Sequence, residues 1–214
     1  MSSPQKRRAA EKNPRKPRRK RTLLILAIIL IVVAVLGVYI YEASQLPPVV
    51  YARLDTSMGL IEAELYHNAT PQTVTNFVNL ARSGFFHQLV WHRIVNGTLI
   101  QTGDPNSRNG YNNSTWGYGG SSQKIPLEID NSLHNYRGYL GMALFGSDPN
   151  SGSSQFYINL KDNSATFDGK YAVFGKVIIG ISVADAIGRV PVYPRDSQPI
   201  TPVFLSSVTI SYNP

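Results

Sequence analysis

Cysteine is absent from this sequence of 214 residues. The chain therefore forms no disulfide, and it has no thiolate for metal binding, redox chemistry or lipid attachment through a thioether. A domain without disulfides must be stabilised by a hydrophobic core, and about 160 residues are enough to supply one.

Motifs for metal binding and for nucleophilic catalysis are also missing. The four histidines are His67, His87, His92 and His134. None has a second histidine four residues on, and no carboxylate cluster lies beside them, so we expect no metal site. There is no Gly-x-Ser-x-Gly motif, and Ser153 lies in a turn-rich segment, although the sequence alone leaves a Ser-His-Asp arrangement open. The glycine-rich segment 117–120 lacks the flanking strand and helix of a phosphate loop.

Acidic residues are scarce at the start of the chain. Residues 1–21 contain ten Lys or Arg and one Glu, whereas the whole chain has a net charge of +8. The remaining residues are therefore close to neutral, and the basic character belongs to a tail. Such a tail could bind nucleic acid, but the segment after it favours a membrane instead.

Residues 22–41 contain no charged side chain. A helix of this length would span about 30 Å, the thickness of a hydrocarbon core. A cleaved signal peptide would have a shorter apolar region and small residues at its end, and a buried core helix would have a polar face. We therefore predict a basic cytoplasmic tail (1–21), a single transmembrane anchor (22–41), a linker (42–48) and an extracytoplasmic domain (49–214), in a plasma membrane protein.

Hydrophobic periodicity predicts the elements of this domain. Strands are expected at 49–55, 60–66, 91–95, 98–102, 137–144, 155–160, 171–179 and 203–212. A helix is expected to begin at Pro71, with Thr70 as its N-cap and Gly84 as its stop, and a second helix at 181–187. The loop 104–124 is longer than about 12–15 residues, a length typical of functional or disordered loops.

The segment from Trp91 to Pro105 is the most informative part of the sequence about function. It contains an Asn-Gly turn between two alternating runs, the strongest short-range signal for a hairpin. Arg93 is a single guanidinium in an otherwise apolar run. It is either tied into a structural ion pair or directed into a groove, and residue patterns do not decide between these.

Four segments of the domain together resemble the cyclophilins, which are peptidyl-prolyl cis-trans isomerases. They are HRIVNGTLIQTGDP (92–105), GYLGMA (138–143), DPNSGSSQFYI (148–158) and FDGKYAVFGKV (167–177). They follow the order of the family, and the resemblance extends over almost all of 49–212. It implies a mainly β fold, an eight-stranded antiparallel closed barrel capped by two α-helices, with a groove for X-Pro peptides.

The resemblance also assigns residues to that groove. Arg93 matches the catalytic arginine of the family. The positions that match substrate-binding residues are His92, Leu99, Gln101, Ala143, Leu144, Gln155, Tyr157, Phe167 and Tyr171. The implied partners are X-Pro segments of protein clients and, through the anchor, a lipid bilayer, but no nucleic acid.

The chemistry agrees with these residue types. Rotation about an X-Pro amide must break resonance, with a barrier of about 18–20 kcal/mol. In the twisted transition state the prolyl nitrogen gains a lone pair, to which a fixed guanidinium can donate a hydrogen bond. That bond is absent from the planar ground state, so it lowers the barrier. No cofactor and no metal is required.

Some positions depart from the family pattern. Thr98 and Thr166 stand where the family usually has aromatic residues of the proline pocket, and Leu144 and Phe145 replace smaller or polar residues. Loss of an aromatic floor would remove about 1–3 kcal/mol of apolar contact. Two functions follow: an isomerase that assists the folding of extracytoplasmic proteins, or a catalytically weak module that binds proline-containing peptides or proteins.

Overall fold

The computed structural model of the chain describes residues 18–44, 46–110 and 113–213. The chain divides into two compact units, residues 1–45 and residues 46–214. The first contains helix α1 (Arg18–Ser44), which includes the uncharged run 22–41. Its large apolar side chains between Leu23 and Leu36 are exposed. Within the described part of the chain, no helix is both long enough and apolar enough to cross a membrane.

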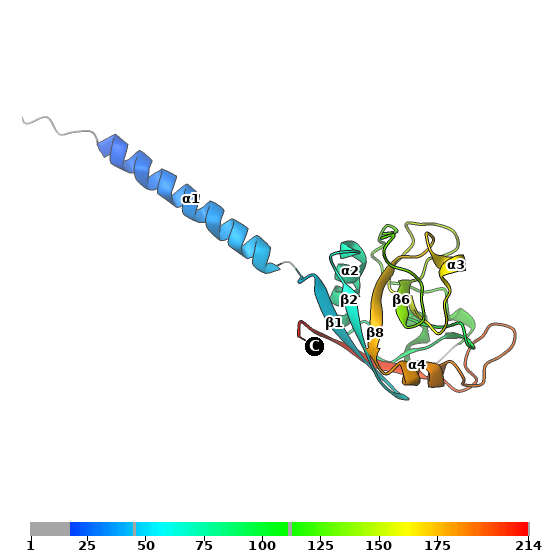
Figure 1. Cartoon of the computed structure of the whole chain (residues 1–214). Helices are drawn as coiled ribbons and strands as arrows, with labels where there is room; N and C mark the ends of the chain where they lie inside the picture. Colours follow the sequence, from blue (N-terminus) through cyan, green and yellow to red (C-terminus); the bar gives the residue numbers. More distant parts are fainter. Residues whose placement is uncertain (1–17, 45, 111–112, 214) are drawn as a thin grey trace, which may run out of the picture. The chain divides into compact units, whose positions relative to one another are not determined.

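The second unit is built on one curled antiparallel sheet with helices packed on it (Figure 1). Its strands are β1 (Val49–Thr56), β2 (Gly59–Tyr66), β3 (Leu89–Val90), β4 (Arg93–Val95), β5 (Leu99–Thr102), β6 (Tyr139–Met142), β7 (Phe156–Asn159), β8 (Val173–Ile179) and β9 (Phe204–Ser211). They are ordered β3-β9-β1-β2-β8-β6-β7-β5-β4. All eight predicted strands are present, although several are shorter than expected.

The prediction of a closed eight-stranded barrel is wrong in two respects. The described sheet has nine strands, because the segment expected to be one strand from Trp91 begins only at Arg93, while Leu89 and Val90 form a separate strand, β3, that pairs with β9. The sheet is also open, because β3 and β4 are its two ends. Trp91 donates its amide to the Val203 carbonyl instead of pairing within the hairpin. The result is a half-barrel.

The helical elements of this unit were predicted only in part. Helix α2 (Pro71–Arg82) and helix α4 (Ile181–Ile187) are the two helices predicted, and α3 (Ser164–Phe167) is a single turn that the periodicity did not reveal. The long loop contains two 3₁₀ segments, η1 (Pro105–Gly110) and η2 (Asn113–Thr115).

Helix α2 begins at Pro71 as predicted, but the predicted capping bond is absent. The side chain of Thr70 bonds back to the Tyr66 carbonyl instead of to the helix. The carboxylate of Glu128 takes over this role, since it accepts hydrogen bonds from the amides of Gln72 and Thr73 at 3.0 and 2.7 Å. A residue more than fifty positions away thus satisfies the free amides of the helix.

The core lies between the concave face of the sheet and α2. Alternate residues of β1 and β2 are buried, including Val50, Leu54 and Ile61. The α2 side chain Phe77 packs against Phe86, Phe156 and Phe174 with ring centroids 5.0–5.5 Å apart. Members of the buried cluster are found from residue 50 to residue 208, so the domain has a core of its own.

Candidate functional site

The sheet register brings the predicted site residues into one row. Arg93 in β4 is paired with Gln101 in β5, and Gln101 with Tyr157 in β7. Tyr157 is in turn paired with Gly141 in β6. Residues directly opposite one another in an antiparallel sheet point to the same face, so these four positions share one face of the domain.

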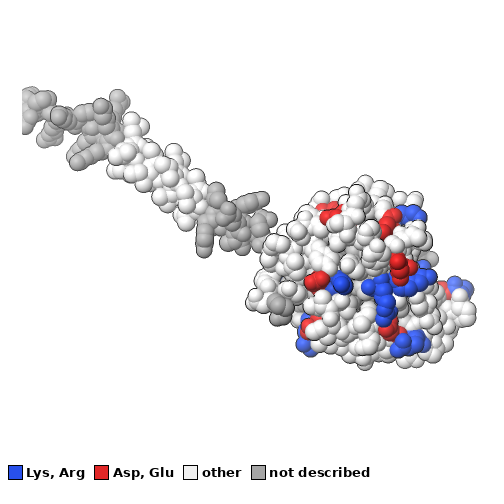
Figure 2. Space-filling model, viewed as in Figure 1, with Lys and Arg blue, Asp and Glu red and all other residues white. Residues whose placement is uncertain are grey.

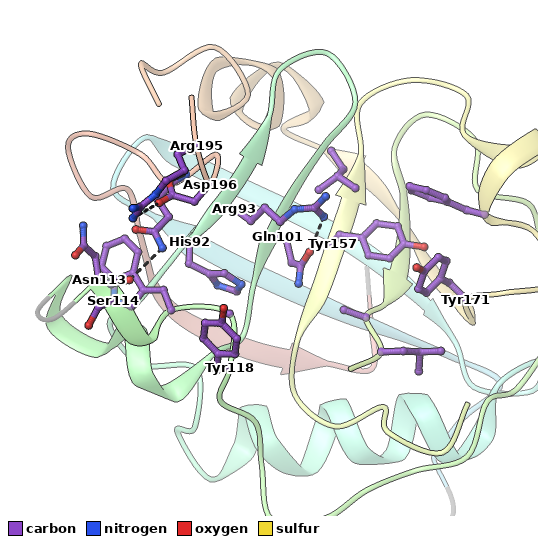
Figure 3. Close-up of a pocket in the computed structure, with 17 residues that line it drawn as sticks. His92, Arg93, Gln101, Asn113, Ser114, Tyr118, Tyr157, Tyr171, Arg195 and Asp196 are labelled. Carbon is purple, nitrogen blue, oxygen red and sulfur yellow. Dashed lines mark hydrogen bonds and ion pairs between the residues drawn. The ribbon is translucent and has the colours of Figure 1, made fainter. Parts of the chain in front are cut away.

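This face carries a groove with a volume of about 680 Å³ (Figure 3). Of the ten residues predicted for the site, nine line it: His92, Arg93, Leu99, Gln101, Ala143, Leu144, Tyr157, Phe167 and Tyr171. Gln155 lies behind Gln101 and lines a smaller cavity beside the groove, together with Phe145. Phe145 therefore lies outside the main groove, whereas Leu144 lines both cavities.

Arg93 has no carboxylate partner among the described residues. Its Nη1 donates to Oε1 of Gln101 at 3.2 Å, and its side chain is exposed. A guanidinium has five N–H donors, so most of them remain for a ligand in the groove. Of the two alternatives for this arginine, the structural ion pair is not formed.

A chain of amides determines how Gln101 faces Arg93. Nε2 of Gln155 donates to the carbonyls of Gly117 and Gly119 at 3.1 and 2.7 Å. Because carbonyls only accept, Oε1 of Gln155 must face Gln101, whose Nε2 donates to it at 2.8 Å. Oε1 of Gln101 is then left to accept from Arg93, and the loop backbone fixes the guanidinium through two side chains.

His92 lies deep beside this chain, with 2% of its surface exposed. Neither ring nitrogen makes a hydrogen bond of ordinary geometry to a described residue, although the Gln155 side chain and the Val90 carbonyl are nearby. Burial lowers the pKa of His92 to about 4, and the charge of Asp104 only partly opposes this effect. The imidazole is therefore neutral at neutral pH, and it is a poor proton donor for catalysis.

The opposite wall of the groove is aromatic. Tyr157, Phe167 and Tyr171 form a triangle with ring centroids 5.3–5.9 Å apart and nearly perpendicular planes. Edge-to-face contacts of this kind are favourable for aromatic rings, and they give the wall a defined shape. Neither Thr98 nor Thr166 lines the groove, whose aromatic surface comes from this triangle together with Trp116 and Tyr118.

Sequence reasoning missed the residues that close the groove on the side of the long loops. They are Asn113, Ser114, Trp116, Gly117, Tyr118, Arg195, Asp196 and Gln198. The amide of Gly117 donates to the buried carboxylate of Asp104, and Gln198 donates to the Asn113 carbonyl at 3.0 Å. The length of the loop 104–124 was the one available signal for the first group, and nothing marked residues 195–198.

The half-barrel, together with an arginine in a groove that has an aromatic wall, defines a protein of the cyclophilin class. The family model for the cyclophilin type peptidyl-prolyl cis-trans isomerases matches residues 51–210. The chain belongs to this family.

Individual proteins agree with this assignment. The human peptidyl-prolyl cis-trans isomerase-like 3 is 36% identical over 162 residues, which cover 75% of this chain and 96% of that protein. A crystal structure of a cyclophilin type isomerase from Cryptosporidium parvum is similar with a TM-score of 0.69 and 29% identity, over 78% of this chain and 99% of that one. A second structure from that organism, obtained in the presence of the dipeptide Ala-Pro, has a TM-score of 0.67 and 28% identity over 75% and 98%. The predicted enzyme class, a peptidyl-prolyl cis-trans isomerase, is thereby confirmed.

Proposed function

We propose that this domain isomerises X-Pro bonds in protein clients and that Arg93 stabilises the twisted transition state. The observation that carries the proposal is the Arg93 guanidinium, which is bound by an amide oxygen and not by a carboxylate. Its free donors point to a hydrogen bond with the pyramidal prolyl nitrogen, which only the transition state can accept. The aromatic triangle and Leu99 would hold the proline ring while the preceding part of the peptide turns.

The fixed orientation of Arg93 supports this mechanism. A donor stabilises developing charge most when it needs no reorganisation at the moment of reaction. Gln101 and Gln155 connect the guanidinium to the carbonyls of Gly117 and Gly119, so they reduce its freedom before a substrate arrives. The Ala-Pro dipeptide named with the Cryptosporidium structure is a ligand of suitable size and chemistry for this groove.

Replacement of Arg93 tests the proposal. We expect Arg93→Ala to lower kcat/KM for an Ala-Pro peptide on the order of 10²-fold, the usual effect of removing one transition-state donor. Exchange spectroscopy by NMR measures the isomerisation directly. Arg53→Ala is the matched control, because Arg53 is an exposed arginine on β1 whose partners are Asp55 and Glu62. Unchanged turnover in Arg93→Ala would show that the mechanism is wrong.

The second candidate function is a module that binds proline-containing peptides with little turnover. Thr98 and Thr166 do not add aromatic surface to the groove. This favours weaker binding of proline than the family pattern implies. A wild-type chain that binds proline peptides in an NMR titration without accelerating their isomerisation would be a binding module. The aromatic triangle and the open groove favour turnover.

The proposal extends to location. Ten positive charges in residues 1–21, followed by twenty uncharged residues, support a single anchor at 22–41 with the N-terminus in the cytoplasm. The isomerase domain would then act on extracytoplasmic proteins as they fold beside the membrane.

A further inference from the structure

The hydroxyl group of Tyr157 does not point into the groove that its ring lines. It donates a hydrogen bond to Oδ1 of Asn135 at 2.8 Å. Figure 3 shows it on the side of the ring remote from Arg93 and Gln101. Only 3% of this residue is exposed, and burial raises the pKa of the hydroxyl well above its usual value, so it remains a hydrogen-bond donor.

The ring of Tyr157 is confined on its other sides as well. Gly141 lies opposite it in the sheet, and a Cβ added there would come within 2.1 Å of the ring. The ring therefore lies directly on the backbone of β6. Phe167 and Tyr171 stand against it at centroid distances of 5.7 and 5.9 Å. The hydrogen bond to Asn135 holds the hydroxyl end of the ring, the end that also lies against Gly141.

Asn135 is in turn held by a carboxylate. It is completely buried, and its amide N and Nδ2 donate to Oδ1 of Asp168 at 2.8 and 2.9 Å. Since Nδ2 faces an acceptor, Oδ1 of Asn135 must face Tyr157. It also accepts a longer bond, 3.3 Å, from Asn159. The carboxylate thus determines which way the amide presents its oxygen.

Asp168 connects this network to a second wall residue. It directly follows Phe167, and its Oδ2 is 2.7 Å from Nδ1 of His134. Burial acts to raise the pKa of Asp168, but the bonds from Asn135 and His134 outweigh this effect and keep it below its usual range. One ionised side chain therefore joins the backbone beside Phe167 to the partner of Tyr157.

We propose that Asn135 and Asp168 are positioning residues for isomerisation, because they hold the Tyr157 and Phe167 walls of the proline groove in place. This inference rests on the proposed function. The walls contact the proline ring equally before and during rotation, so a misplaced wall weakens peptide binding more than it slows the chemical step. A tyrosine at this position gains from its hydroxyl an anchor that a phenylalanine would lack.

Two variants of the full chain in mild detergent test the inference. Tyr157→Phe removes one oxygen and keeps the ring, and Asn135→Ala removes its acceptor. We expect each to raise KM for an Ala-Pro peptide about threefold to tenfold, with kcat nearly unchanged, as loss of a buried hydrogen bond predicts. The double variant should be no worse than Asn135→Ala alone, because both changes remove the same bond.

The control separates positioning from general stability. Asp185→Asn removes the negative charge and one of the two oxygens that accept bonds from Arg137 at 2.7 Å, and neither residue lines the groove. It should lower the thermal midpoint without changing KM. If Asp185→Asn raises KM as much as Tyr157→Phe does, or if the two wall variants are additive, the inference is overturned.

Direct binding distinguishes failure of the inference from failure of the proposed function. Titration with the Ala-Pro peptide gives Kd without turnover. A wild-type chain that binds but does not isomerise can therefore still be compared with the variants. A raised Kd in Tyr157→Phe then supports the inference. A wild-type chain that binds and isomerises, with Tyr157→Phe unchanged, overturns the inference alone. A wild-type chain that neither binds nor isomerises overturns both.

Discussion

Arg93 and His92 are neighbours in the sequence with opposite surroundings. The exposed guanidinium of Arg93 reaches Gln101, whereas the imidazole of His92 is buried without a hydrogen bond to a described residue. Both side chains line the groove, but Arg93 lies in β4 with its guanidinium exposed, whereas His92, just before β4, has only 2% of its surface exposed. The Arg93 guanidinium is charged and exposed, so it can contact a ligand. The buried His92 imidazole is neutral.

The buried imidazole makes stability depend on pH. Burial lowers the pKa of His92 to about 4 in the folded domain, below the ordinary histidine value of 6.5 that applies to the unfolded chain. Unfolding therefore takes up a proton between these values. We expect the free energy of unfolding to be highest above pH 6.5 and to fall on the order of 3 kcal/mol as the pH drops to about 4.

Fluorescence of Trp91 and Trp116, both in the domain, follows denaturant unfolding at several pH values. His92→Gln cannot titrate, so its stability should be nearly constant across that window. An equal slope in the variant would show that another group causes the dependence. Asp168 and Asp185, whose pKa values are lowered, contribute with the same sign at lower pH.

Among the elements, helix α2 is predictable from its own sequence, but its N-terminal cap comes from a residue far away in the chain. Proline at the first position and the apolar spacing of Val74, Phe77 and Val78 were enough to predict the helix. Its cap was not predictable, because Glu128 reaches the helix from a segment with no regular structure. A side chain that bonds to the backbone of a distant segment produces no periodic pattern in the sequence, so such a cap cannot be predicted from periodicity.

Removal of this cap should destabilise the domain. We expect Glu128→Ala to lower the free energy of unfolding by about 1–2 kcal/mol, because two helix amides and the Thr73 hydroxyl lose a charged acceptor. Glu62→Gln is the matched control, since that carboxylate is only partly buried and lies 3.9 Å from Arg53. Denaturant titration measures both. Equal midpoints in the two variants would contradict the assigned cap.

At the scale of the whole molecule, charge is divided between the parts of the chain. The basic residues are concentrated at 1–21, and the rest of the sequence is close to neutral. On the face of the domain shown in Figure 2, basic and acidic side chains lie beside one another and not in a field of one sign. This distribution suits a domain that recognises peptides by the shape and side chains of its groove and not by its net charge.

The proposed anchor predicts two separable properties. The full chain should sediment with membranes and resist extraction by high salt and by alkali, whereas a chain without residues 1–45 should be soluble. Both should have the same kcat/KM, because every residue assigned to the groove belongs to the unit 46–214. Release of the full chain by salt alone would show that it is not anchored. Protease added to intact cells would test on which side the domain lies.

Local alternation and turn chemistry in the sequence predict most strands, the helix that begins at Pro71 and the helix at 181–187, and the resemblance to the cyclophilins assigns the residues on the sheet side of the groove. The packing of distant segments makes the sheet an open half-barrel, brings Glu128 to the N-terminus of α2 and closes the groove with side chains from 113–118 and 195–198 that include Tyr118 and Arg195. It also allows Tyr157 to bond to Asn135. These features depend on which distant segments pack together, and that choice is made by the shared core, not by any one stretch of chain.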